Sequence, residues 1–209
     1  MRKKQILTGY RILFGLVGFS ALVTEVATIV ERGRFVPVNF FSYFTIESNI
    51  FALTILILSA LALAQGKESN RLAMLRGAST VYMVTVIIVF DLLLSNIEGA
   101  SLTAIPWDNT VLHYIIPVAV LVDWLSDIPR TPIVFRRALI WLLFPLAYVA
   151  YSLIRGHFVG WYPYPFLNPT EQGYAPVAVI TITIGLGATA LIWLVSLVTR
   201  IKKVKSKLI

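Results

Sequence analysis

Six long apolar segments divide the chain, and they restrict its fold more than any other feature. They cover residues 6–30, 41–64, 72–96, 107–126, 133–154 and 174–199. A helix of roughly 20 apolar residues crosses the hydrocarbon core of a bilayer. Inside a bilayer, only helices and closed barrels satisfy their own backbone polar groups. The sequence therefore predicts an all-α integral membrane bundle of six transmembrane helices, forming a single domain over residues 1–209.

The composition agrees with a membrane protein. Hydrophobic residues make up 58% of the chain and charged residues only 13%, whereas a soluble domain is about 25% charged. The net charge of +8 is more typical of basic loops on the cytoplasmic face than of nucleic-acid binding. We therefore expect membrane lipids rather than nucleic acid as partners, and the oligomeric state stays open.

Cysteine and histidine counts limit the chemistry. The chain has no cysteine and two histidines, His113 and His157. Disulfides and thiolate metal ligands are therefore excluded. With so few ligands, we expect neither a metal site nor a cofactor.

The distribution of Lys and Arg predicts the orientation. If both termini share one side, the opposite side carries only Arg32, Arg34 and Arg155. The terminal side holds Arg2, Lys3, Lys4, Lys67, Arg71, Arg130, Arg136, Arg137, Arg200, Lys202, Lys203, Lys205 and Lys207. Because basic loops stay in the cytoplasm, we expect both termini to be cytoplasmic, in a multi-pass protein of the plasma membrane.

Four ionisable or nucleophilic residues fall at one predicted depth. Glu25, Thr45, Asp91 and His113 each lie within about six residues of the outer end of a different helix. At 1.5 Å per residue, this places them roughly 6–9 Å below the outer surface. On a helix over 41–64, the polar residues Ser42, Thr45, Ser48 and Asn49 also share one stripe. Because polar groups are costly in hydrocarbon, the shared depth predicts a functional site.

Other readings of these residues stay open. A membrane threonine usually bonds its own helix, and a lone histidine or acid often has a structural role. A proton-coupled transporter would use Glu25, Asp91 and His113 as a relay. A non-catalytic lipid-binding protein would use the same groups only as polar contacts.

Prolines and a loop rich in aromatic residues shape the outer end. Pro117 and Pro145 lack an N–H group, which predicts kinks because the carbonyls of His113 and Trp141 lose their helical partners. The loop over 155–172 has the composition of an interfacial aromatic belt. The belt is the favoured interpretation, and a lid or rim over the polar level is the alternative, which is compatible with it. The rim candidates are Arg155, His157, Trp161, Tyr162 and Tyr164.

Four motifs resemble a known family. They are NFFSYFTIESN at 39–49, LHYIIP at 112–117, DW at 123–124 and GWYPYPF at 160–166. They resemble the proline-rich six-helix membrane proteins, which are similar to the family of the androgen-induced protein and the androgen-dependent TFPI-regulating protein. The resemblance covers nearly the whole chain. It implies an intramembrane hydrolase that cleaves fatty acid esters of hydroxy fatty acids. Its catalytic threonine and histidine match Thr45 and His113.

The implied chemistry needs further groups. A threonine hydroxyl becomes a nucleophile when a base takes its proton, and neutral imidazole can do this near pH 7. A third group usually orients the base, and Asp91 or Glu25 are the candidates. Donors must also stabilise the oxyanion. The candidates for that role are Asn49, Tyr43 and Tyr114.

Overall fold

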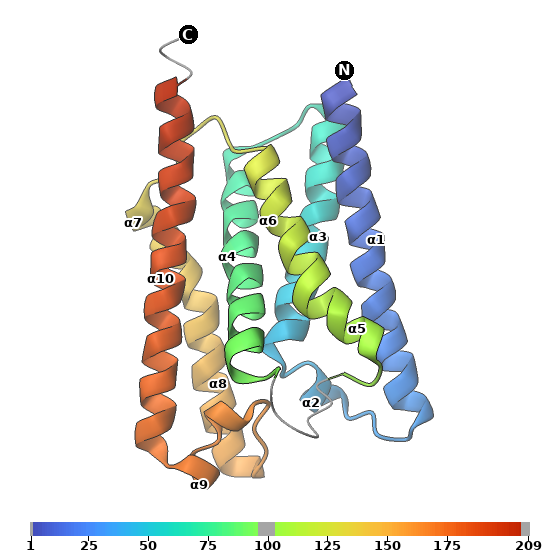
Figure 1. Cartoon of the computed structure of the whole chain (residues 1–209), viewed down its shortest axis with the longest axis vertical. Helices are drawn as coiled ribbons and strands as arrows, with labels where there is room; N and C mark the ends of the chain where they lie inside the picture. Colours follow the sequence, from blue (N-terminus) through green and yellow to red (C-terminus); the bar gives the residue numbers. More distant parts are fainter. Residues whose placement is uncertain (1, 96–102, 206–209) are drawn as a thin grey trace.

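The computed structural model describes residues 2–95 and 103–205, and over these residues it contains helices and no strand (Figure 1). Six helical segments are long and apolar enough to cross a membrane, which confirms the six predicted segments. They are α1 (Arg2–Glu31), α3 (Phe44–Gln65), α4 (Asn70–Leu93), the run of α5 (Pro106–Thr110), η1 (Val111–Ile115) and α6 (Ile116–Ser126), the run of α7 (Phe135–Ala138), η2 (Leu139–Leu142) and α8 (Leu143–Val159), and α10 (Tyr174–Lys205). The protein is therefore a multi-pass membrane protein by the length and composition of its helices.

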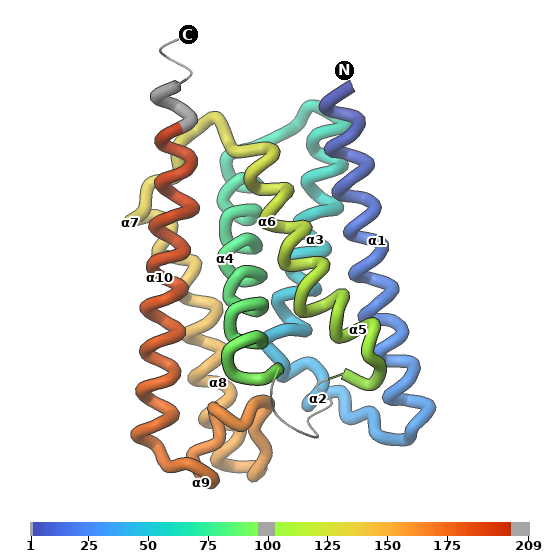
Figure 2. The backbone as a smooth tube through the Cα atoms, in the orientation of Figure 1, coloured from blue at the N-terminus to red at the C-terminus, as the bar shows by residue number. Residues whose placement is uncertain are grey.

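The helices form one bundle with both ends of the chain at the same end (Figure 1). α1 packs on α3, α3 on α4, and α4 on both α6 and α10. α8 joins the bundle through aromatic side chains: Phe44 of α3 stacks on Phe144 at 5.4 Å and meets Tyr148 edge-on at 5.1 Å. The backbone trace in Figure 2 shows that the short helices α2 (Pro37–Phe40), α5 (Pro106–Thr110) and α9 (Pro169–Gln172) all lie at the end remote from the termini.

The second long helix begins three residues later than expected. Pro37 starts the separate short helix α2, and the chain then turns, with the Ser42 N–H donating to the carbonyl of Asn39. Tyr43 is extended and forms the N-cap of α3. Ser42 therefore does not lie on the predicted polar stripe, and its hydroxyl instead donates to the carbonyl of Val38. The later start places Thr45 in the first turn of α3.

The third helix ends earlier than expected. α4 ends at Leu93, so Asp91 lies two residues from the helix end, and the predicted end at 96 lies outside the described residues. The predicted fifth helix is interrupted, because η2 (Leu139–Leu142) is a tighter 3₁₀ turn. Pro145 explains why the carbonyl of Trp141 lacks its helical donor. The hydroxyl of Tyr82 donates to that carbonyl at 2.8 Å.

A buried cluster of four charges lies near the terminal end. Arg11 of α1 bonds Asp123 at 2.6 Å and Asp127 at 2.7 Å. Arg76 of α4 bonds the same two carboxylates at 2.9 and 3.1 Å. Two positive and two negative charges neutralise one another, so the cluster joins α1, α4 and α6 without a net buried charge.

Candidate functional site

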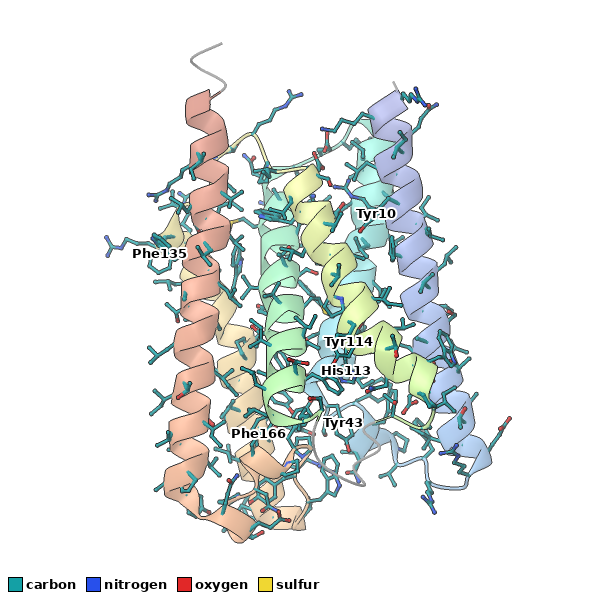
Figure 3. The ribbon with its side chains drawn as sticks, viewed as in Figure 1. Tyr10, Tyr43, His113, Tyr114, Phe135 and Phe166 are labelled. Carbon is teal, nitrogen blue, oxygen red and sulfur yellow. The ribbon has the colours of Figure 1, made fainter. Side chains whose placement is uncertain are left out.

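A polar cavity of about 350 Å³ lies at the end of the bundle remote from the termini. Its polar wall contains Thr45, His113, Glu25, Tyr43 and Tyr164. Figure 3 shows His113 and Tyr43 in this half of the bundle, whereas Tyr10 lies toward the termini. Three of the four residues predicted at one depth therefore share one cavity. Asp91 is the exception.

Thr45 is held at the start of α3 by a tyrosine from the distant loop. The Thr45 N–H donates to the hydroxyl of Tyr164 at 3.2 Å, and the Thr45 hydroxyl is also 3.2 Å from that oxygen. The first N–H groups of a helix have no intrahelical acceptor, which leaves them available for such partners. The N–H of Ile46 in the same turn has no hydrogen-bond acceptor within residues 2–95 and 103–205. Thr45 therefore lies at the positive end of a long helix, beside an unused donor.

His113 is oriented by its own helix rather than by an acid. Its Nδ1 lies 3.1 Å from the carbonyl oxygen of Asn109. Because a carbonyl only accepts hydrogen bonds, Nδ1 carries the proton and Nε2 keeps the lone pair of the neutral ring. Phe90 stacks on the imidazole with the ring centroids 4.0 Å apart, which fixes the plane of the ring. His113 is therefore presented in the tautomer that can accept a proton at Nε2.

A wide helical turn produces this arrangement. Residues Val111–Ile115 form a π-helical turn, and the N–H of Ile116 donates to the carbonyl of Val111, five residues earlier. Such turns leave carbonyls free of their usual partners and occur often at functional sites. The carbonyl of Leu112 accepts a hydrogen bond from Asn49 at 3.1 Å instead. The kink expected before Pro117 thus takes the form of a π turn that contains His113.

Asn49, one of the three candidates for the oxyanion donor, makes two hydrogen bonds to main-chain carbonyls. Its side-chain amide donates both to the carbonyl of Thr45 at 2.8 Å and to that of Leu112 at 3.1 Å. An amide has two N–H donors, so both are used. Asn49 therefore joins α3 to the π turn. One of its hydrogen bonds reaches the main chain of Thr45, and the other reaches the main chain of Leu112, the residue before His113.

The two predicted acids separate in the structure. Glu25 lines the polar cavity, and both of its carboxylate oxygens accept from the N–H of Ala104, at 2.9 and 2.8 Å. Asp91 is exposed and accepts a hydrogen bond from Tyr114 at 3.3 Å. Neither acid hydrogen-bonds the His113 ring, whose Nδ1 contacts the carbonyl of Asn109. Asp108, which the sequence reading missed, is fully buried and accepts from the Thr24 hydroxyl at 2.8 Å.

The two tyrosines proposed as oxyanion donors also separate. Tyr43 lines the cavity and packs edge-on against Tyr164 at 5.6 Å. Tyr114 is engaged with Asp91 and meets Phe90 edge-on at 5.4 Å. Of these two tyrosines, Tyr43 lines the polar cavity and Tyr114 does not.

The aromatic-proline loop, which we define as residues 160–168 between α8 and α9, lies over the site. Trp161 contacts Tyr43 edge-on at 5.7 Å, and the guanidinium of Arg155 lies 4.9 Å above the Trp161 ring and bonds Asn39. The ring of Tyr162 packs directly on Gly156, where no side chain fits. His157 lies in the last turn of α8 beside Phe158 and does not line the polar cavity.

A second cavity begins at the same threonine. It measures about 100 Å³ and is lined mainly by apolar side chains of α4, α8 and α10, including Val86, Phe90 and Leu146. Thr45 and Tyr164 line both cavities. The threonine therefore lies where a polar space meets an apolar space. Among the described residues, no hydrogen bond joins Thr45 directly to His113.

Comparison with known proteins adds no assignment. No protein-family model, no curated protein and no solved structure matches the chain. Any function must therefore be argued from the site itself.

Proposed function

We propose that the protein is an intramembrane hydrolase of lipid esters, with Thr45 as nucleophile and His113 as general base. The observation that carries the proposal is the position of Thr45. It lies with His113 on the wall of a polar cavity and also lines the apolar one. An ester has the same division, with a polar carbonyl next to an apolar chain. The motif resemblance supports the same two residues.

The reaction follows from the groups present. Thr45 Oγ1 attacks the ester carbonyl and passes its proton to Nε2 of His113. The intermediate then expels the alcohol, which takes the proton from His113. A water molecule hydrolyses the acyl-threonine by the same route in reverse. Without substrate, such catalytic contacts are often longer than in the reacting complex. The proposal is therefore compatible with a structure in which Thr45 and His113 are not directly hydrogen-bonded.

For the oxyanion, we favour a main-chain donor over the side chain of Asn49. The N–H of Ile46, which has no acceptor among the described residues, follows Thr45 directly, and Ile46 lines the polar cavity. A backbone donor at a helix start stabilises developing negative charge. We assign the oxyanion to this turn of α3, because both N–H donors of Asn49 are already used.

The polar cavity favours a substrate with an anionic group. Arg32 and Arg34 line it on the side of the α1–α2 connection. A fatty acid ester of a hydroxy fatty acid has a free carboxylate at one end and an acyl chain at the other. The arginines would bind the carboxylate while the apolar cavity takes part of the chain. With both termini cytoplasmic, as the basic residues predict, the site faces the outer leaflet of the plasma membrane.

A fluorophosphonate probe tests the proposal. The wild-type protein should be labelled, and Thr45→Ala should abolish labelling. Thr54→Ala is the matched control, because the Thr54 hydroxyl bonds only Ile50 of its own helix. Labelling that persists in Thr45→Ala would rule out this nucleophile. No labelling of the wild type, together with no turnover of any lipid ester, would favour a transporter or a lipid-binding protein.

A further inference from the structure

Tyr164 is buried over the site by its own loop. It is 6% exposed and lies between α8 and α9. Its ring stacks on Phe166 with the centroids 5.1 Å apart and the planes at 5°, and it meets Tyr43 edge-on. Figure 3 shows Phe166 at the same end of the bundle as Tyr43 and His113. These contacts fix the ring, so its hydroxyl reaches Thr45 in a defined direction.

The two contacts of this hydroxyl constrain the protons of Thr45. A phenol has one donor and two acceptor positions. The Thr45 N–H occupies an acceptor position, since an N–H only donates. Either oxygen can be the donor in the second contact, and with the phenol as donor its proton is directed to Thr45 Oγ1. When Oγ1 accepts from Tyr164, the proton of the threonine hydroxyl is free to point elsewhere in the polar cavity, where His113 lies.

The phenol does not compete with His113 for this proton. Burial raises the pKa of Tyr164 to about 12, so the side chain stays protonated at neutral pH. A protonated phenol donates a hydrogen bond but does not remove a proton from threonine. The two side chains therefore have separate roles at Thr45.

We infer that Tyr164 is a positioning residue for the nucleophile: its hydroxyl holds the backbone and side chain of Thr45 so that the threonine proton faces His113. The inference rests on the proposed hydrolase function. It makes the aromatic-proline loop a part of the active site as well as an interfacial belt. The loop and α3 are far apart in the sequence, and Tyr164 is the direct link between the loop and Thr45.

Tyr164→Phe isolates this role, because it removes only the hydroxyl and keeps the ring that packs on Phe166 and Tyr43. Tyr162→Phe is the matched control: it makes the same change in the same loop, on a ring packed against Gly156. We expect Tyr164→Phe to lower kcat for a lipid ester in nanodiscs by roughly ten- to hundredfold, as misplaced reacting groups do. KM should change little, and Tyr162→Phe should match the wild type.

Hydrogen exchange of the Thr45 amide provides a readout that does not depend on activity. The Thr45 N–H should exchange faster in Tyr164→Phe than in the wild type and in Tyr162→Phe, since it loses its acceptor. Unchanged exchange would overturn the contact, and faster exchange with wild-type kcat would overturn its catalytic role. If the wild type has no hydrolase activity, the proposed function fails together with the positioning role. An active wild type with an equally active Tyr164→Phe defeats only the inference.

Discussion

The side-chain amide of Asn49 donates to the main-chain carbonyl of Leu112 at 3.1 Å. This hydrogen bond joins the helix of Thr45 to the turn of His113, because the same amide also donates to the carbonyl of Thr45 at 2.8 Å. The π turn makes the contact available by leaving Leu112 without its usual helical donor. The relative position of the two proposed catalytic residues is thus coupled to one buried side chain.

Replacing Asn49 should therefore weaken both stability and activity. Asn49→Leu keeps a similar side-chain shape but removes both side-chain hydrogen bonds, including the one that the carbonyl of Leu112 accepts. We expect a loss of about 1–2 kcal/mol in the free energy of unfolding, given the modest net value of hydrogen bonds between membrane helices. Turnover should fall as well. Thermal unfolding in detergent and ester hydrolysis measure the two effects, and Thr54→Val serves as a control within α3. Wild-type turnover in Asn49→Leu would show that this link does not set the catalytic geometry.

The pH dependence of hydrolysis distinguishes the groups around His113. Activity should fall on acidification, because a protonated imidazole cannot accept the threonine proton. Asp91→Asn should leave this acidic limb unmoved, since Asp91 bonds Tyr114 while Asn109 occupies Nδ1 of His113. On the alkaline side, the pKa of Tyr164 is raised to about 12, so we expect no loss from this phenol up to roughly pH 10. The measurement is kcat/KM against pH for the wild type and Asp91→Asn. A shifted acidic limb in the variant would restore Asp91 to the mechanism.

The buried charge cluster predicts unequal effects of two aspartates. Asp123→Asn removes a carboxylate whose side chain is 4% exposed and leaves two buried arginines under-compensated. Breaking such a pair costs about 3–5 kcal/mol. Asp127→Asn should cost less, because that side chain is 27% exposed and water can replace part of the interaction. Thermal unfolding of the two variants tests the order. An equal or larger loss in Asp127→Asn would contradict it.

Single cysteines can report the orientation in this cysteine-free chain. Gln172→Cys lies at the last residue of α9, at the end of the bundle with the proposed site, and Ser69→Cys lies between α3 and α4, at the terminal end. In sealed cells, an impermeant thiol reagent should modify the first and not the second. The opposite pattern would invert the proposed orientation and place the site in the cytoplasmic leaflet.

The arginines of the polar cavity should determine selectivity for acids. Replacing both, as Arg32→Gln with Arg34→Gln, should raise KM roughly tenfold or more for a fatty acid ester of a hydroxy fatty acid, as expected from the loss of charge-assisted hydrogen bonds. KM for the same ester with its carboxylate methylated should change little. The ratio of the two KM values in nanodiscs is the measurement. An equal rise for both substrates would assign the arginines to stability rather than to recognition.

The sequence by itself determined the six membrane helices and the end of the bundle where the polar residues gather. Both properties are local, because hydropathy over about 20 residues sets a span and distance from its end sets depth. Hydropathy did not predict that α3 begins at Phe44 rather than at Phe41. Whether Phe41 and Ser42 continue the helix depends on the turn that follows α2 and on contacts such as that of Ser42 with Tyr151.

Only the tertiary structure decided which polar groups meet. Depth along a helix says nothing about rotation around it, and each residue turns the side chain by about 100°. The π turn at Val111–Ile115 adds a local change in register. These rotations place His113 Nδ1 on Asn109 rather than on Asp91, and direct both donors of Asn49 to main-chain carbonyls. They also bring Tyr164, from a loop far along the chain, to the hydroxyl of Thr45, since such a contact depends on how the helices and the loop pack together.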